Sequence, residues 1–252
     1  MTPALPQTRI SIELVPRSRS GLRAELEMVR AHLPGIDTVN IPDFPRFSTR
    51  SWAGCALARP HHQAIPHIRA VDINPREPLP MLETLATHGI TEVLIITGDA
   101  PADMSARVYD VDAVDVIRRF RHELPDVRVY AGLDPYRQSF ARERDYLERK
   151  LDAGAVGFFT QPFFDLRLMD AYADLMPEGA DVWWGATTVT TEQTLNYWRA
   201  RNHAVFPRSF EPTLDWNRAF AAATLQFARE RAQHVYFMPV RADVREYLEG
   251  IV

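Results

Sequence analysis

The chain has 252 residues, of which 46% are hydrophobic and 25% are charged, and its formal net charge is −4. This composition is typical of a folded globular protein, and the slightly acidic balance disfavours nucleic acid as a partner. Cys55 is the only cysteine, which excludes an internal disulfide and a cysteine-rich zinc site. No apolar run approaches the roughly 18 residues of a membrane span, and residues 1–9 contain no apolar signal core. We therefore expect a cytoplasmic protein with no membrane partner.

Short β-rich runs alternate with longer amphipathic runs along the whole chain. Strands are predicted at residues 9–14, 36–41, 64–71, 92–97, 127–133, 156–161, 182–187 and 234–238. Helices are predicted at residues 21–33, 79–88, 111–124, 139–153, 166–176, 191–201, 216–232 and 240–250. Several strand candidates are continuously apolar, as in Val93-Leu94-Ile95-Ile96. Such runs are typical of strands that are covered on both faces of a parallel sheet.

The alternation of strands and helices predicts the α/β class and, more specifically, a (β/α)8 TIM barrel. A chain of 252 residues is close to the roughly 250 residues typical of this fold. We expect a single domain over residues 1–252, because no linker or low-complexity tract interrupts the pattern. The stretches 42–62 and 202–214 are predicted to be irregular, and they are long enough to serve as active-site loops.

Polar side chains follow several of the predicted strands. Glu13, Asp99 and Gln161 each stand at the carboxyl end of an apolar run, and those ends meet at one mouth of a barrel. We expect these three side chains to share that mouth. The sequence contains no G-x-G-x-x-G turn, P-loop or G-x-S-x-G turn, so a Rossmann, P-loop or serine-hydrolase site is not supported. The adjacent pair His61-His62 lacks the usual spacing of metal ligands, and we expect no metal site.

Several longer segments resemble one enzyme family, the methylenetetrahydrofolate reductases. The run that begins at Lys150 is the most specific of them, because it is long and mixed in composition. The segments are Ser11-Ile12-Glu13-Leu14-Val15-Pro16, Pro66-His67, Thr97-Gly98-Asp99-Ala100-Pro101, Lys150-Leu151-Asp152-Ala153-Gly154-Ala155, Thr160-Gln161-Pro162-Phe163-Phe164-Asp165 and His234-Val235-Tyr236-Phe237-Met238. They follow one order over nearly the whole chain.

The resemblance implies reduction of 5,10-methylenetetrahydrofolate to 5-methyltetrahydrofolate, a step of one-carbon metabolism and methionine biosynthesis. The electrons would come from NAD(P)H, usually through FAD. Glu13 would be the general acid that supports protonation of the folate nitrogen. The implied substrate-binding residues are Asp99, Gln161 and Phe163. The implied cofactor-binding residues are His67, Thr97, Gly98, Gly132 and Lys150. The implied partners are therefore a folate and a nicotinamide dinucleotide.

The sequence departs from the family where the family contacts flavin. Thr97 replaces the family's arginine, and Gly132-Leu133-Asp134 replaces a stretch with a tyrosine and a histidine. Tyr130 and Tyr136 are nearby candidates for the missing tyrosine. The loss of an arginine, an aromatic ring and a histidine weakens flavin binding by several kcal/mol, at about 0.5–3 kcal/mol for each contact. FAD is therefore doubtful, and we hypothesise that NAD(P)H gives its hydride directly to the methylene-iminium carbon.

Simpler structural readings stand beside these assignments. Glu13 could be an ion-paired carboxylate of the barrel rim, and Asp99 could form a turn or cap a helix. Gln161 and Phe163 could simply pack at the rim. His67 suits a buried structural histidine, and Lys150 the end of a helix dipole. Arg50 is a candidate for binding a folate tail or a phosphate, although a solvated loop position is the favoured interpretation.

Other functions also remain open from the sequence. They are an FAD-dependent reductase of the same family, a folate-linked C1 transferase or lyase, and a folate-binding barrel without catalysis. The choice between NADH and NADPH and the oligomeric state are open as well.

Overall fold

The computed structural model describes residues 7–100 and 107–252, and the strands within these ranges form a closed parallel barrel. Each strand pairs with its neighbours in chain order, and β1 closes the ring against β8. The strands are β1 (Ile10–Glu13), β2 (Thr38–Ile41), β3 (Gln63–Arg69), β4 (Glu92–Ile96), β5 (Arg128–Leu133), β6 (Gly157–Thr160), β7 (Asp181–Thr187) and β8 (His234–Met238). The predicted (β/α)8 barrel is confirmed.

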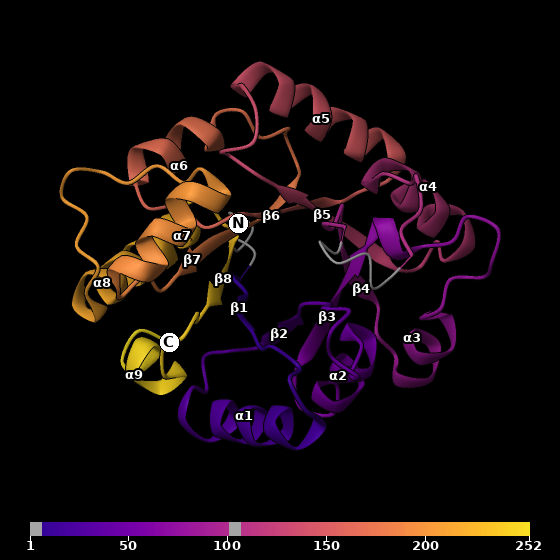
Figure 1. Ribbon diagram of the computed structural model, residues 1–252, viewed down its shortest axis with the longest axis horizontal. Coiled ribbons are helices and arrows are strands. Elements are labelled where there is room, and N and C mark those ends of the chain that lie inside the picture. The colour runs from indigo at the N-terminus through magenta and orange to yellow at the C-terminus, as the bar shows by residue number, and fades with distance from the viewer. Residues whose placement is uncertain (1–6, 101–106) are drawn as a thin grey trace, which may run out of the picture.

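Helices surround the barrel on its outer side (Figure 1). They are α1 (Arg19–His32), α2 (Ser51–Ala58), α3 (Leu82–His88), α4 (Ala113–Glu123), α5 (Phe140–Ala153), α6 (Leu166–Ala173), α7 (Glu192–Asn202), α8 (Leu214–Glu230) and α9 (Val244–Leu248), with a 3₁₀ turn at Ala70–Asp72. None of the helices in the described ranges has the length and apolarity needed to cross a bilayer.

The prediction that residues 42–62 are irregular was wrong in part, because this stretch contains α2. The helix has the sequence SWAGCALA, whose small residues produce no amphipathic stripe for a sequence pattern to detect. Gly54 allows close packing, because a Cβ there would lie 3.1 Å from the Ile41 Cδ1 atom and 3.2 Å from Leu22. The last helix is also shorter than the predicted 240–250, and Asp243 caps its start through the Glu246 backbone N–H.

Two hydrophobic layers stabilise the fold. The larger one lies between the strands and the helices and includes Ile12, Val39, Val93 and Phe158. The smaller one fills the barrel interior with Ile65, Leu94, Tyr130, Phe159, Trp183 and Tyr236. A filled interior closes the barrel below the strand ends, so any cavity must open at the mouth.

An ion pair between the partly buried Arg9 and the buried Glu92 ties together the amino-terminal ends of four strands. The Arg9 guanidinium donates to both carboxylate oxygens of Glu92, each at 2.7 Å, and to the Thr38 hydroxyl at 3.1 Å. The Tyr130 hydroxyl donates to Glu92 at 3.0 Å. Burial alone would raise the pKa of Glu92, but the hydrogen bond from Arg9 and its charge outweigh burial and lower that pKa. This cluster lies at the end of the barrel opposite the mouth, where it stabilises the fold.

Substitution Glu92→Ala should lower the free energy of unfolding by about 1–3 kcal/mol, because it leaves the partly buried Arg9 cation without its main partner. Urea denaturation of both proteins measures the difference. The control is Glu249→Ala, which removes an exposed partner of Arg245 and should change stability little. A loss for Glu92→Ala as small as that of the control would contradict the assignment.

Candidate active site

A large cavity of about 610 Å³ opens at the carboxyl ends of the strands. Glu13 ends β1, His67 lies near the end of β3, and Gln161 directly follows β6, and all three line this cavity. Its apolar wall includes Leu94 and Phe159. The arrangement combines a flat apolar surface with a few polar groups, which is typical of a small-molecule site.

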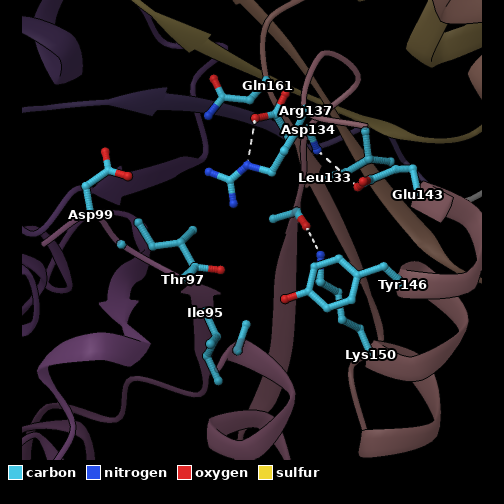
Figure 2. Close-up of a pocket in the computed structure, with 14 residues that line it drawn as sticks. Ile95, Thr97, Asp99, Leu133, Asp134, Arg137, Glu143, Tyr146, Lys150 and Gln161 are labelled. Carbon is cyan, nitrogen blue, oxygen red and sulfur yellow. Dashed lines mark hydrogen bonds and ion pairs between the residues drawn. The ribbon is translucent and has the colours of Figure 1, made fainter. Parts of the chain in front are cut away.

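A second cavity of about 180 Å³ adjoins the first, and Figure 2 shows the residues that line it. Thr97 and Asp99, which follow β4, lie on one side of it, and Tyr146 and Lys150 of α5 lie on the other. The predicted residues Gly98 and Gly132 also line it. Four residues line both cavities, so the two are adjacent: Ile96, Gly132, Leu133 and Gln161.

The expectation that three polar side chains share one mouth is met only in part. Glu13 lines the large cavity and Asp99 the small one, and Gln161 lines both. The Asp99 side chain is exposed, and its backbone oxygen accepts a hydrogen bond from Arg69 at 2.5 Å.

Phe163 is the predicted site residue that the structure places elsewhere. Its side chain is fully buried in the layer between strands and helices, 5.8 Å from the Trp184 ring and 5.6 Å from the Tyr172 ring. Neither cavity includes it among the described lining residues. Phe163 lies two residues after Gln161, beyond the end of β6, where the alternation of a strand no longer predicts the direction of a side chain. The expected contact with substrate is therefore replaced by a packing role.

Glu13 is a buried acid with few partners. Burial raises the pKa of its carboxyl to about 7, although the Asn40 amide, which donates to its Oε2 atom at 3.2 Å, acts in the opposite direction. The His67 Nε2 atom lies 3.9 Å from the same oxygen. Burial lowers the pKa of His67 to about 3, so the imidazole is neutral at physiological pH. A carboxyl group that changes protonation near neutral pH is suited to general acid catalysis.

The Lys150 side chain is held by contacts within the protein. Its ammonium donates to the Gly132 backbone oxygen at 2.5 Å and lies 3.8 Å from the centre of the Tyr146 ring. The side chain is almost fully buried, and burial lowers its pKa to about 8. Nearby, Glu143 accepts hydrogen bonds from the Asp134 backbone and the Gln138 amide. These contacts pair Lys150 and Glu143 with groups of the protein itself.

Arginines lie on one arc of the mouth of the large cavity. Arg17 follows β1, Arg46 follows β2 and Arg241 follows β8, and these three strands are neighbours in the barrel. Glu13 is the single acidic residue among the described residues that line the cavity. Arg241 has a left-handed backbone with φ of 54°, a conformation that is uncommon for residues other than glycine and often found at functional sites. This arc makes the entrance favourable for anions.

Two further residues differ from or extend the sequence analysis. Arg50 pairs with Asp43 at 2.5 Å and with Asp72 at 3.4 Å, and its side chain stays 37% exposed, so it is partly solvated and engaged by two carboxylates. Asn40 was not singled out, although its position near the end of the second strand was a usable signal. The described residues contain no group of His, Cys, Asp or Glu arranged to hold a metal ion.

Comparison with known proteins identifies the family. The family description "Methylenetetrahydrofolate reductase" matches residues 45–182. The chain belongs to the methylenetetrahydrofolate reductase family. Most of the expected site residues lie within the matched segment, whereas Glu13 precedes it.

The alignments with curated relatives cover only part of the chain. The 5,10-methylenetetrahydrofolate reductase of Escherichia coli (strain K12) is 28% identical over 122 residues, which are 48% of this chain and 41% of that protein. The reductase of Salmonella typhimurium is 27% identical over 122 residues, which are again 48% of this chain and 41% of that protein. The alignment thus spans less than half the length of these reductases.

Solved structures share the fold. A 2,3-dimethylmalate lyase has a TM-score of 0.56 at 12% identity, with 94% of this chain and 76% of that chain covered. An oxaloacetate acetylhydrolase has a TM-score of 0.58 at 9% identity, with 92% and 75% covered. At such low identity the likeness concerns the barrel alone.

The raised pKa of Glu13 has a measurable effect on stability. Between pH 4.5, the ordinary pKa of the group, and about 7, the unfolded chain loses the proton while the folded protein keeps it. The folded state is therefore penalised increasingly as pH rises, and the penalty is constant above about pH 7. Glu13→Gln should remove it and stabilise the protein by up to about 3 kcal/mol above pH 7, with little effect below pH 4.5. Urea denaturation from pH 4 to pH 9 measures this, and a gain that does not depend on pH would contradict the burial argument.

Proposed function

We propose that this protein reduces 5,10-methylenetetrahydrofolate to 5-methyltetrahydrofolate, with a hydride transferred directly from NAD(P)H. The observation that carries the proposal is Glu13, a buried carboxyl group with a pKa of about 7, on the wall of an apolar cavity with arginines at its mouth. Membership of the reductase family supports folate as the substrate.

In the proposed reaction, protonated Glu13 gives its proton to the folate nitrogen that leaves the methylene bridge. The bridged ring opens, and the second nitrogen forms an iminium with the methylene carbon. The hydride of the reduced nicotinamide, with its electron pair, forms the new C–H bond at that carbon. The products are 5-methyltetrahydrofolate and NAD(P)⁺, and Glu13 recovers a proton from solvent. Holding the two rings together on the wall formed by Leu94 and Phe159 supplies proximity, and the iminium supplies the electrophile.

Gln161 and Asp99 are proposed to hold the pterin. The edge of this ring offers several hydrogen-bond donors and acceptors, which an amide and a carboxylate match. Gln161 lines both cavities and therefore reaches a ring in the large cavity. Asp99 contacts the same ring only if the pterin lies towards the junction of the two cavities.

The described residues do not fit the flavin of the family well. The small cavity holds about 180 Å³, below the roughly 300–1,000 Å³ of ordinary ligand pockets. Lys150 already donates to Gly132. The two tyrosines that remained as candidates are also engaged, because the Tyr130 hydroxyl donates to Glu92 and the Tyr136 hydroxyl to the Pro162 oxygen. These contacts support a reaction without flavin, and His67, Thr97 and Gly98 are then proposed to lie near the nicotinamide.

Activity and colour test the proposal together. Purified protein should oxidise NADH or NADPH only when methylenetetrahydrofolate is present. It should show no visible absorption from a flavin, and it should not gain activity from added FAD. Glu13→Gln should lower kcat by roughly 10²-fold or more while folate binding persists, because the amide cannot donate the carboxyl proton.

The other outcomes identify the alternatives. A yellow protein that loses activity when its flavin is removed is an FAD-dependent reductase. Folate binding without nicotinamide turnover indicates a C1 transferase, a lyase or a binding protein. Turnover unchanged in Glu13→Gln removes Glu13 from the proposed role.

The arginines at the mouth should bind the charged parts of the two ligands, since a folate carries carboxylates and a nicotinamide dinucleotide carries phosphates. Arg46→Ala and Arg241→Ala should each raise KM for at least one ligand by about 2–5-fold, as expected for exposed charge pairs. The effect should shrink at high salt. Arg118→Ala is the control, because this arginine lies exposed on α4 away from the cavities. Equal KM values for both ligands in all variants would contradict the role of these arginines.

A further inference from the structure

A chain of polar side chains joins three neighbouring strands inside the barrel. Asn40 of β2 pairs directly with Glu13 of β1 in the sheet register. The Asn40 Nδ2 atom lies 3.2 Å from the Glu13 Oε2 atom and 3.1 Å from the His67 Nε2 atom. On the other side of the amide, the Ser11 hydroxyl donates to the Asn40 Oδ1 atom at 2.7 Å.

The hydrogen bonds use every polar atom of the Asn40 amide. The side-chain nitrogen carries two hydrogens, one for Glu13 and one for His67, and the oxygen accepts from Ser11. Asn40 and Ser11 are fully buried, so water does not compete for these bonds. The ionised Glu13 carboxylate can only accept, so it fixes the amide nitrogen towards the acid and the imidazole, and the Ser11 hydroxyl donates to the amide oxygen on the other side.

We propose that Asn40 is a positioning residue of the active site, which holds the Glu13 carboxyl and the His67 imidazole in one fixed arrangement while Ser11 supports its amide by donating to the oxygen. This inference rests on the proposed role of Glu13 as general acid. It assigns to Asn40 and Ser11 a role in proton transfer that acts through Glu13, although neither residue is among the described residues that line the two cavities.

The groups around Glu13 give the Asn40 amide a strong effect on the pKa of its carboxyl. The titratable side chains that face it are His67 from β3 and Tyr236 from β8. Burial lowers the pKa of His67 to about 3 and raises the pKa of Tyr236 well above its usual value, so both are neutral at physiological pH. The Asn40 hydrogen bond is thus the interaction that favours the ionised form of Glu13 against burial. Without it, the acid would hold its proton to a higher pH and become a weaker proton donor.

The same amide determines the form of the imidazole. Because Asn40 donates to the Nε2 atom, that nitrogen must be the acceptor, and the single proton of neutral His67 must be on Nδ1. Hence His67 does not donate a hydrogen bond to the Glu13 carboxylate, although the two side chains are only 3.9 Å apart.

Substitution Asn40→Leu tests the proposal, since it keeps the size of the side chain and removes all its hydrogen bonds. The titration of Glu13 should move upwards by about one pH unit or more. Two measurements report it: the alkaline limb of the pH–rate profile, and ¹³C NMR of the carboxyl carbons in the ligand-free protein, with the Glu13 signal assigned from Glu13→Gln. Ser11→Ala should shift both in the same direction by a smaller amount, and it provides the test if Asn40→Leu does not fold.

Asn217→Leu is the matched control. Asn217 is also a buried asparagine with a saturated amide, which bonds to the backbone of Val189 and Thr213, but it lies on α8 outside the barrel. This variant should lose stability while the titration of Glu13 stays unchanged. ¹⁵N NMR of wild-type protein should show His67 protonated on Nδ1, and a proton on Nε2 would overturn the assigned orientation of Asn40.

The two readouts separate this inference from the proposed function. If the NMR titration moves in the Asn40 and Ser11 variants but the protein does not reduce methylenetetrahydrofolate, the arrangement of Glu13 stands and the proposed reaction is wrong. If the wild-type protein is an active reductase and neither titration moves in Asn40→Leu or Ser11→Ala, the positioning role of Asn40 is overturned.

Discussion

The register of the parallel strands β8, β1, β2 and β3 is the constraint on which the site depends. Closure of the barrel by the pairing of β1 with β8 brings residues from opposite ends of the chain to one mouth. Within that register Glu13 lies directly beside Asn40, and His67 stands close enough to share the same amide. A shift of one residue in any of these strands would turn the side chain to the other face of the sheet. The chemistry of the mouth is therefore a consequence of strand pairing.

The two ends of the barrel each hold a carboxyl group, and their surroundings shift its pKa in opposite directions. At the amino-terminal end, Glu92 is saturated by Arg9 and Tyr130, so its charge is fixed and contributes to stability. At the mouth, Glu13 lacks a cationic partner within hydrogen-bond distance among the described residues, and burial shifts its pKa towards neutrality. One carboxylate is thus held ionised by an ion pair, and the other is prepared by burial to exchange a proton.

The family membership and the local geometry address different parts of the function. The match to the reductase family covers residues 45–182 and supports a folate substrate. The geometry bears on the cofactor, because the Lys150 ammonium, which the resemblance assigns to cofactor binding, donates to the Gly132 backbone oxygen instead. A side chain with the expected identity in the expected place can therefore have a different role when its neighbours change.

Local patterns in the sequence were sufficient for the barrel and for much of the mouth. Short β-rich runs, several of them continuously apolar as at 93–96 and most of them followed by an amphipathic helix, predicted all eight strands, because burial on both faces imposes that pattern directly on the residues. The polar residues after the strands were also found from the sequence, since chain order and barrel topology together place them at one end. Helix α2 was missed because small residues pack closely without leaving an amphipathic pattern.

Only the tertiary structure decided which of these side chains meet. It divided Glu13 and Asp99 between two adjoining cavities, placed Phe163 in the core, and brought Asn40 between Glu13 and His67. Each outcome depends on the direction of a side chain and on distances between residues far apart in the chain. Periodicity determines on which face of a strand a residue lies, but hydrogen bonds and burial, which exist only in the folded protein, determine what that residue can do.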